Sequence, residues 1–557
     1  MVVLGDFLDD LIGGCGVVAW SLVVGGVVWA LAVLGAWRPL PTPAREALAR
    51  CLRLVGAGAA GVVVAGSAQV TIKARLLAAA LGRSAFPEFA STPFFLAHLV
   101  QAMVAVAVLA ADVLVRRRPG SRARWAALAL ATAALVANTA WLVHGASRLE
   151  HRGALMTVTA LHALGAGAWG GGLAQLVALW RLARRRPDVA ALWPVVLRRF
   201  SFVALPATAL VAGTGAALGW VYVRTWNGLA GTPYGALVVT KAVLFACALA
   251  LGALNFLVAR RAVRGVAGPE LRTRAPYHVE TEALALLALL LAAQALSAQP
   301  PAIDMGDYAA SWREVVQVFA PKRPRLETPP VAEVQRERPD ALAAPGTPSP
   351  GDAWAEFNHN VAGLVVVAIA LLACAARCNV PLARHWPLGF VALAVFLLFR
   401  NDPEAWPLGH EGFWTSLRDG GILQHRLAVL LASALGILEW RARIAQPPQG
   451  RLPFVFPLLS FVGGVLLLTH SHSAFEVKSD YLIEISHTGM GLLALLVAGG
   501  RLLELRLAPA GGRLAGVGSL VAMLLIGAIL VFYREPDVSA TRAVAAVAHV
   551  ADVATAR

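Results

Sequence analysis

The sequence predicts an all-α, polytopic membrane protein of about fourteen transmembrane helices, with both termini outside the cytoplasm. Of its 557 residues, 58% are apolar and only 14% are charged, whereas a soluble domain averages about 25% charged residues. Apolar runs near the roughly 20 residues that a spanning helix needs recur along the whole chain. Lys and Arg are concentrated in every second loop, as in the cytoplasmic loops of membrane proteins. This composition excludes a soluble enzyme, a fibrous protein and a disordered one.

Apolar runs bounded by charges or prolines predict the individual helices. Those of the first half lie at 11–36, 54–80, 93–115, 125–145, 153–180, 200–223, 235–259 and 279–298. Those of the second half lie at 358–374, 386–399, 420–439, 454–470, 481–500 and 515–533. Met1 to Asp10 carries no Lys or Arg, so we expect the first run to be a spanning helix and not a cleavable signal.

The loop charges predict the orientation. Seven alternate loops hold between two and six Lys and Arg each, whereas each short loop between them holds at most two. The basic loops are expected to be cytoplasmic, and an even number of helices then puts both termini on the other side. The net charge of +16 is therefore attributed to cytoplasmic loops beside membrane lipid, and no nucleic-acid partner is expected.

The chain divides into four parts. Residues 1–298 are expected to form an eight-helix bundle, and residues 358–533 a six-helix, histidine-rich bundle. Residues 299–357 contain the stretches "PKRPRLETPP" and "APGTPSP", which are typical of an extended Pro-rich linker. This linker and the tail at 534–557 are both expected on the outer side.

The thirteen histidines are unevenly placed. Only His278 and His385 lie at the cytoplasmic ends of their predicted helices. Neutral imidazole is the commonest metal-binding side chain, so the outer side of the protein is predicted to bind a transition metal. The histidines of the outer half and outer loops are His98, His144, His151, His162, His359, His410, His425, His470, His472, His487 and His549.

In the first half, His162 lies about nine residues into its helix, where an imidazole needs a partner. It is expected to contribute to a polar site with His98 and His144, and a structural hydrogen bond to a neighbouring helix is the alternative. Trp169 follows seven residues later on the same face. Lys241, in the outer third of its helix, is expected to pair with a polar group inside the bundle.

The second half is predicted to hold a copper site that faces outward. Imidazoles on three helices reach similar depth there, and a nearby thioether suits Cu(I), while Cu(II) stays open. Glu484 is expected to orient a neighbouring imidazole through its second ring nitrogen. The alternative is a b-type haem held by two of these imidazoles, which would make the protein an oxidoreductase. The proposed ligands are His425, His470, His472, His487 and Met490, and the haem pair would be His425 with His487.

Three segments of the first half resemble a known family. They are "TALHALGAGAWGGGLAQL" at 159–176, "RRFSFVALPATALVAGTGAALGWVYV" at 198–223 and "LAGTPYGALVVTKAVLFACALALGALNFLVARR" at 229–261. Together they resemble the copper resistance protein D (CopD, PcoD) family, in a pattern that includes His162, Trp169, Lys241 and Asn255. The resemblance covers about residues 150–298, whereas the histidine pattern alone extends it to 358–533.

The resemblance implies a multi-pass protein of the bacterial inner membrane that moves copper from the periplasm to the cytoplasm or otherwise serves copper resistance. It also implies a periplasmic copper-binding partner of the CopC type, expected as a separate chain. The sequence contains no G-x-x-x-x-G-K-[ST] loop and no C-x-x-C-H motif, so neither ATP-driven pumping nor covalent haem is expected. We therefore expect no enzyme, with a copper-delivery assembly factor as a further alternative.

Overall fold

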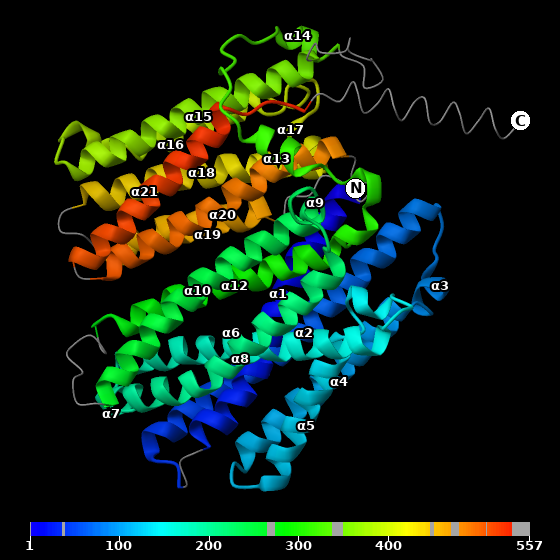
Figure 1. The fold of residues 1–557 in the computed structure, drawn as a ribbon, viewed down its shortest axis with the longest axis vertical. Coiled ribbons are helices and arrows are strands. Elements are labelled where there is room, and N and C mark those ends of the chain that lie inside the picture. The colour runs from blue at the N-terminus through cyan, green and yellow to red at the C-terminus, as the bar shows by residue number, and fades with distance from the viewer. Residues whose placement is uncertain are drawn as a thin grey trace, which may run out of the picture.

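The computed structural model describes residues 2–35, 39–263, 273–336, 349–445, 450–468, 478–507 and 509–536. These residues are mainly helical, and the only β-pairing among them is an isolated bridge between Ala405 and Glu411. Figure 1 shows two helical bundles side by side, one drawn in blue to green and the other in yellow-green to red. The expectation of an all-α fold is confirmed for the described residues.

The first bundle is built from eight long helices. They are α1 (Val2–Val28, continued by the π-helical turn η1, Trp29–Leu34), α2 (Thr42–Leu81), α4 (Pro93–Arg117), α5 (Arg122–Thr139), α6 (Arg152–Ala183), α8 (Trp193–Tyr222), α10 (Pro233–Val263) and α12 (Ala275–Ala298). Shorter elements connect them: α3 (Phe86–Ala90), η2 (His144–Ala146), α7 (Pro187–Ala190) and α9 (Trp226–Ala230).

The second bundle is built from six helices. They are α15 (Pro350–Arg377), α16 (Leu388–Arg400), α18 (Gly420–Ile444), α19 (Val455–Leu468), α20 (Lys478–Arg506) and α21 (Pro509–Val531). Between the bundles lie η3 (Ala302–Asp304), η4 (Gly306–Tyr308), α13 (Trp312–Val318) and α14 (Val331–Val334), and η5 (Leu382–His385), α17 (Phe413–Ser416) and η6 (Leu452–Phe454) connect the later helices.

Each of the fourteen predicted segments overlaps one of these long helices. By length and composition, ten helices of the described residues could cross a membrane. Among the others, α16 and α19 have only 13 and 14 residues. The structure thus supports a multi-pass helical membrane protein, while the count of about fourteen spans and the placement of both termini stay predictions.

Several helices begin earlier than the apolar runs do. α2 starts at Thr42 and includes the basic residues Arg45 and Arg50, which sequence analysis places in a loop. α15 starts at Pro350, where Ser349 and Asp352 form a capping box that satisfies the first backbone N–H groups. Its first turns therefore occupy residues that the sequence assigns to the linker.

Close backbone packing holds the first bundle together. α1 lies at its centre and packs against α2, α6 and α12. α1 and α6 meet through Gly25 and Gly171, where a Cβ on Gly171 would lie 1.8 Å from the carbonyl oxygen of Ser21. Small residues allow such close contact between membrane helices.

The two bundles meet along α10 and α12 of the first and α20 of the second. The hydroxyl of Tyr481, at the start of α20, donates a hydrogen bond to the carbonyl oxygen of Ala230 in α9. Nearby, Lys478 forms an ion pair of 2.6 Å with Glu314 of α13. Polar contacts therefore fix the N-terminal end of α20 against the first bundle and the connecting segment.

Candidate metal centre

Histidines of two helices meet at the end of the second bundle where α15 and α20 begin. His359 of α15 and His487 of α20 lie with their ring centroids 5.8 Å apart, edge to face. Tyr533, just beyond α21, stacks on the other side of His359 at a centroid distance of 4.0 Å. The three helices converge because α21 packs against both α15 and α20.

His425 of α18 lies within electrostatic range of His359. Its Nδ1 is 2.6 Å from Oδ1 of Asp402, a buried carboxylate in the loop after α16. A carboxylate that accepts from one ring nitrogen orients the other nitrogen and makes it a better metal ligand. His425 is also the more accessible ring, since its side chain is 44% exposed.

In all three imidazoles, Nδ1 lies within hydrogen-bonding distance of an oxygen acceptor. Nδ1 of His359 lies 2.8 Å from the carbonyl oxygen of Ala355, and Nδ1 of His487 lies 3.2 Å from that of Ile483. With Nδ1 of each ring protonated and donating, Nε2 is the nitrogen that carries the lone pair a metal needs. We therefore name His359, His425 and His487 the outer histidine cluster.

Two of the predicted ligands, His470 and His472, lie outside the described residues. Met490 and Glu484 are buried in α20, on either side of His487 in sequence. Within the described ranges, no group of three or more His, Cys, Asp or Glu side chains is placed to hold a metal ion together. The three imidazoles of the outer histidine cluster are therefore not placed to hold a metal ion by themselves in this arrangement.

Sequence analysis listed His359 among the outer histidines but did not include it in the site. The available signal was the polar run Asn358-His359-Asn360 at the start of an otherwise apolar helix. Asp402 was missed as well, because it follows a short helix and comes from a loop. Nδ1 of His487 lies beside a backbone carbonyl oxygen, and the expectation that Glu484 orients this ring stays a prediction.

In the first bundle, His162 faces α8. Its Nδ1 lies 2.9 Å from the hydroxyl of Thr214, which itself donates to the carbonyl oxygen of Leu210. Lys241 of α10 is within electrostatic range of the same ring, and among the described residues it forms no ion pair or hydrogen bond. This geometry matches the structural hydrogen bond that was the alternative for His162.

His98 and His144 lie elsewhere. His98 is buried in α4, with its ring 4.3 Å from that of Phe94. His144 sits in η2 beside the rings of Tyr222 and Tyr234, with centroids 6.3 and 6.1 Å away, and burial lowers its pKa. In the described part of the chain, no hydrogen bond or ring contact joins His98, His144 and His162.

Trp169 has a partner that sequence analysis missed. Its Nε1 donates to Oε1 of Glu282 on α12 at 3.0 Å, and Nδ2 of Asn255 on α10 donates to Oε2 at 3.1 Å. All three side chains are at most 4% exposed. The feature of the sequence that could have indicated this contact was a single Glu inside the apolar run of α12. A buried carboxylate needs hydrogen-bond donors.

Beyond the membrane-spanning helices, acidic groups surround the outer histidine cluster. Burial raises the pKa of Glu535 to about 7, although the hydroxyl of Tyr533 donates to it at 2.8 Å. Burial also raises the pKa of Glu404, close to Asp402. This end of the second bundle therefore combines imidazoles with carboxyl groups, and the buried Glu356 there pairs with Arg325 and Arg534.

Comparison with known proteins supports the resemblance found in the sequence. Residues 194–296, which span α8, α10 and α12, match the family model described as copper resistance protein D. We call residues 194–296 the CopD region because of this match. Over 101 residues it is 39% identical to the copper transport protein CutJ of Bacillus subtilis (strain 168). No solved structure matches the chain.

The matched segment is a small part of both proteins. It covers 18% of this chain and 18% of the Bacillus protein. Lys241, Asn255 and Glu282 lie inside the CopD region, whereas His162, Trp169 and the outer histidine cluster lie outside it. These comparisons support a copper-related function, and they give no support to the haem alternative.

Proposed function

We propose that the protein transports copper across the bacterial inner membrane, from the periplasm to the cytoplasm. The CopD region and the relative named as a copper transport protein support copper as the cargo. Ten helices of the described residues could cross a membrane, as the body of a transporter requires, and we propose that the protein has no enzymatic activity. We further propose a separate periplasmic copper-binding protein of the CopC type as the donor.

The outer histidine cluster is the proposed entry site for copper. The observation that carries this proposal is the shared use of Nδ1 by His359, His425 and His487, which leaves Nε2 as the ligand atom of each ring. Imidazole binds both Cu(I) and Cu(II), and Met490 would add a soft ligand suited to Cu(I). Because the neutral ring binds metal, copper affinity is expected to fall in acid.

The remaining ligands are proposed to come from His470 and His472. The segment that carries them joins α19 to the N-terminal end of α20. Together with the outer histidine cluster they would complete a coordination sphere that the described residues alone do not form.

Copper titration of the purified full-length protein tests this proposal. A variant with His359→Ala and His487→Ala should lose the tightest copper site, and His425→Ala should weaken it. The matched control is His151→Asn, an exposed histidine with positive φ of 53°, a conformation that Asn tolerates. Unchanged stoichiometry and affinity in the double variant would show that the cluster is structural.

Copper uptake into proteoliposomes tests transport itself. Wild-type protein should admit copper, and the double variant should admit much less at limiting copper. Binding without uptake would instead indicate copper delivery to another protein. A strong Soret absorption band in purified wild-type protein would overturn the copper assignment of the cluster in favour of haem.

A further inference from the structure

A second polar centre lies at the opposite end of the six-helix bundle. A cavity of about 80 Å³ opens there among α15, α18, α19, α20 and α21. Along α15, Arg377 is 18 residues beyond His359, which corresponds to about 27 Å of helix. The loop charges assign this end of the bundle to the cytoplasm, so the cavity and the outer histidine cluster are expected on different sides of the membrane.

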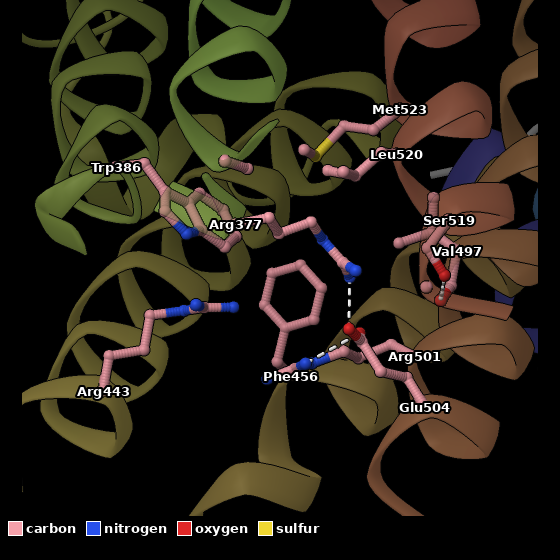
Figure 2. Close-up of a pocket in the computed structure, with 12 residues that line it drawn as sticks. Arg377, Trp386, Arg443, Phe456, Val497, Arg501, Glu504, Ser519, Leu520 and Met523 are labelled. Carbon is pink, nitrogen blue, oxygen red and sulfur yellow. Dashed lines mark hydrogen bonds and ion pairs between the residues drawn. The ribbon is translucent and has the colours of Figure 1, made fainter. Parts of the chain in front are cut away.

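Arginines from three helices converge on this cavity. Figure 2 shows Arg377 of α15, Arg443 of α18 and Arg501 of α20 pointing toward its centre from different directions. Glu504 is the only acidic residue that lines the cavity, and it pairs with Arg377 and with Arg501 at 2.8 Å. Glu439 lies behind the lining and pairs with Arg443 at 2.8 Å and Arg501 at 3.2 Å. Three guanidinium groups thus face two carboxylates, and one positive charge is left over.

The cavity also contains hydrogen-bond donors without acceptors. Nε of Arg501 and Nε1 of Trp386 are buried and have no hydrogen-bond partner among the described residues. Both residues line the cavity, and the guanidinium of Arg443 lies 4.8 Å from the ring centroid of Trp386. Buried donors are normally satisfied, so these two N–H groups need an acceptor that the described residues do not supply.

We infer that this cavity is a binding site for one phosphate-type oxyanion. A tetrahedral oxyanion offers several acceptor oxygens to the unsatisfied N–H groups and neutralises the excess charge, and guanidinium groups match its geometry. The volume is well below the roughly 300 Å³ of the smallest usual small-molecule sites, so only a single anionic group fits. Such a group is carried by an anionic phospholipid headgroup or by free inorganic phosphate.

The test uses full-length protein and two probes. In detergent, inorganic phosphate is titrated and thermal stability is followed. In nanodiscs of phosphatidylcholine, with or without phosphatidylglycerol, retained lipid is identified by native mass spectrometry. Stabilisation by phosphate indicates free phosphate as the ligand, and selective retention of phosphatidylglycerol indicates a lipid headgroup.

Arg443→Gln is the principal variant, because Glu439 keeps its pair with Arg501 when Arg443 is neutral. It should weaken binding of the effective probe about tenfold, as expected for a lost charged hydrogen bond. Trp386→Phe removes the indole N–H but keeps the ring, and should weaken binding about threefold. Arg441→Gln, on the same helix but not in the lining, is the control and should leave binding unchanged.

Two outcomes would overturn the inference. If neither probe stabilises or remains with the wild-type protein, the arginines serve only to join the helices. If Arg441→Gln weakens binding as much as Arg443→Gln, the effect comes from general surface charge.

Discussion

Substitution of Gly171 by alanine should separate α1 from α6 and strongly destabilise the protein. A Cβ at this position would lie 1.8 Å from the carbonyl oxygen of Ser21 and 2.9 Å from Cα of Gly25. Both obstacles are backbone atoms, so no side-chain rotation can relieve the overlap. Its neighbour Gly170 supplies a matched control, because a Cβ there would lie 3.5 Å from the nearest atom, in the side chain of Leu290.

The distances set the size of the effect. Ordinary contact begins near 3.4 Å, so the helices would have to move apart by about 1.5 Å at Gly171, and overpacking of a core typically costs about 1–3 kcal/mol. We expect the upper end of that range or more, because the movement also loosens the buried contacts of Trp169. Gly170→Ala should instead be neutral or stabilise by up to about 1 kcal/mol, as alanine favours a helix over glycine.

Thermal unfolding of both variants in the same detergent measures the difference. The apparent midpoint should fall by several degrees for Gly171→Ala and stay level or rise for Gly170→Ala. Equal midpoints for the two variants would refute the close helix packing from which the prediction is made.

Three further predictions address the buried carboxylate, pH and topology. Trp169→Phe removes one of the two hydrogen bonds to Glu282 and should lower the free energy of unfolding by about 1–3 kcal/mol. A combined Trp169→Phe, Glu282→Gln variant should lose less stability than the sum of the two single changes. Simple additivity would contradict a direct interaction between the two side chains. The pKa of Glu535 is about 7 in the folded protein against 4.5 ordinarily, so between these values the folded state holds a proton that the unfolded state has lost. The free energy of unfolding should therefore fall as pH rises from 4.5 through 7. Glu535→Gln should reduce this fall, and an unchanged pH profile in the variant would contradict the burial of that carboxyl group. Reporter fusions after Arg118 and Arg186 should indicate the cytoplasm, and a periplasmic signal at either position would overturn the orientation.

The helices could be predicted from the sequence because a bilayer imposes a length of apolar residues on each span. Their ends were less predictable. α2 continues through Arg45 and Arg50 because backbone hydrogen bonding and contacts with α1 extend the helix past its apolar part. Long basic side chains can hold their charge in water while the backbone stays helical. Composition alone therefore underestimates the length of helices that project beyond the membrane.

The candidate site was only partly predictable, because depth in the membrane does not say which helix faces which. His425 and His487 were placed at one level from the sequence, and the structure brings His359 beside His487 through the packing of α15 and α20 on α21. The grouping of His98, His144 and His162 rested on depth alone, and in the structure His98 contacts Phe94, His144 contacts Tyr222 and Tyr234, and His162 contacts Thr214. Asp402 comes from a loop, where no periodicity indicates the direction of a side chain.

The arrangement of α20 gives a physical reason to treat the two halves as one pathway. This helix carries His487 near its N-terminal end, Arg501 near the other end, and packs against α10 and α12 of the CopD region along its length. α20 therefore links the outer histidine cluster to the two helices that carry Lys241 and Glu282. The hydrogen bond from Tyr481 to Ala230 and the ion pair of Lys478 with Glu314 fix its N-terminal end against α9 and α13, so the second bundle is held to the CopD region by polar contacts as well as by helix packing.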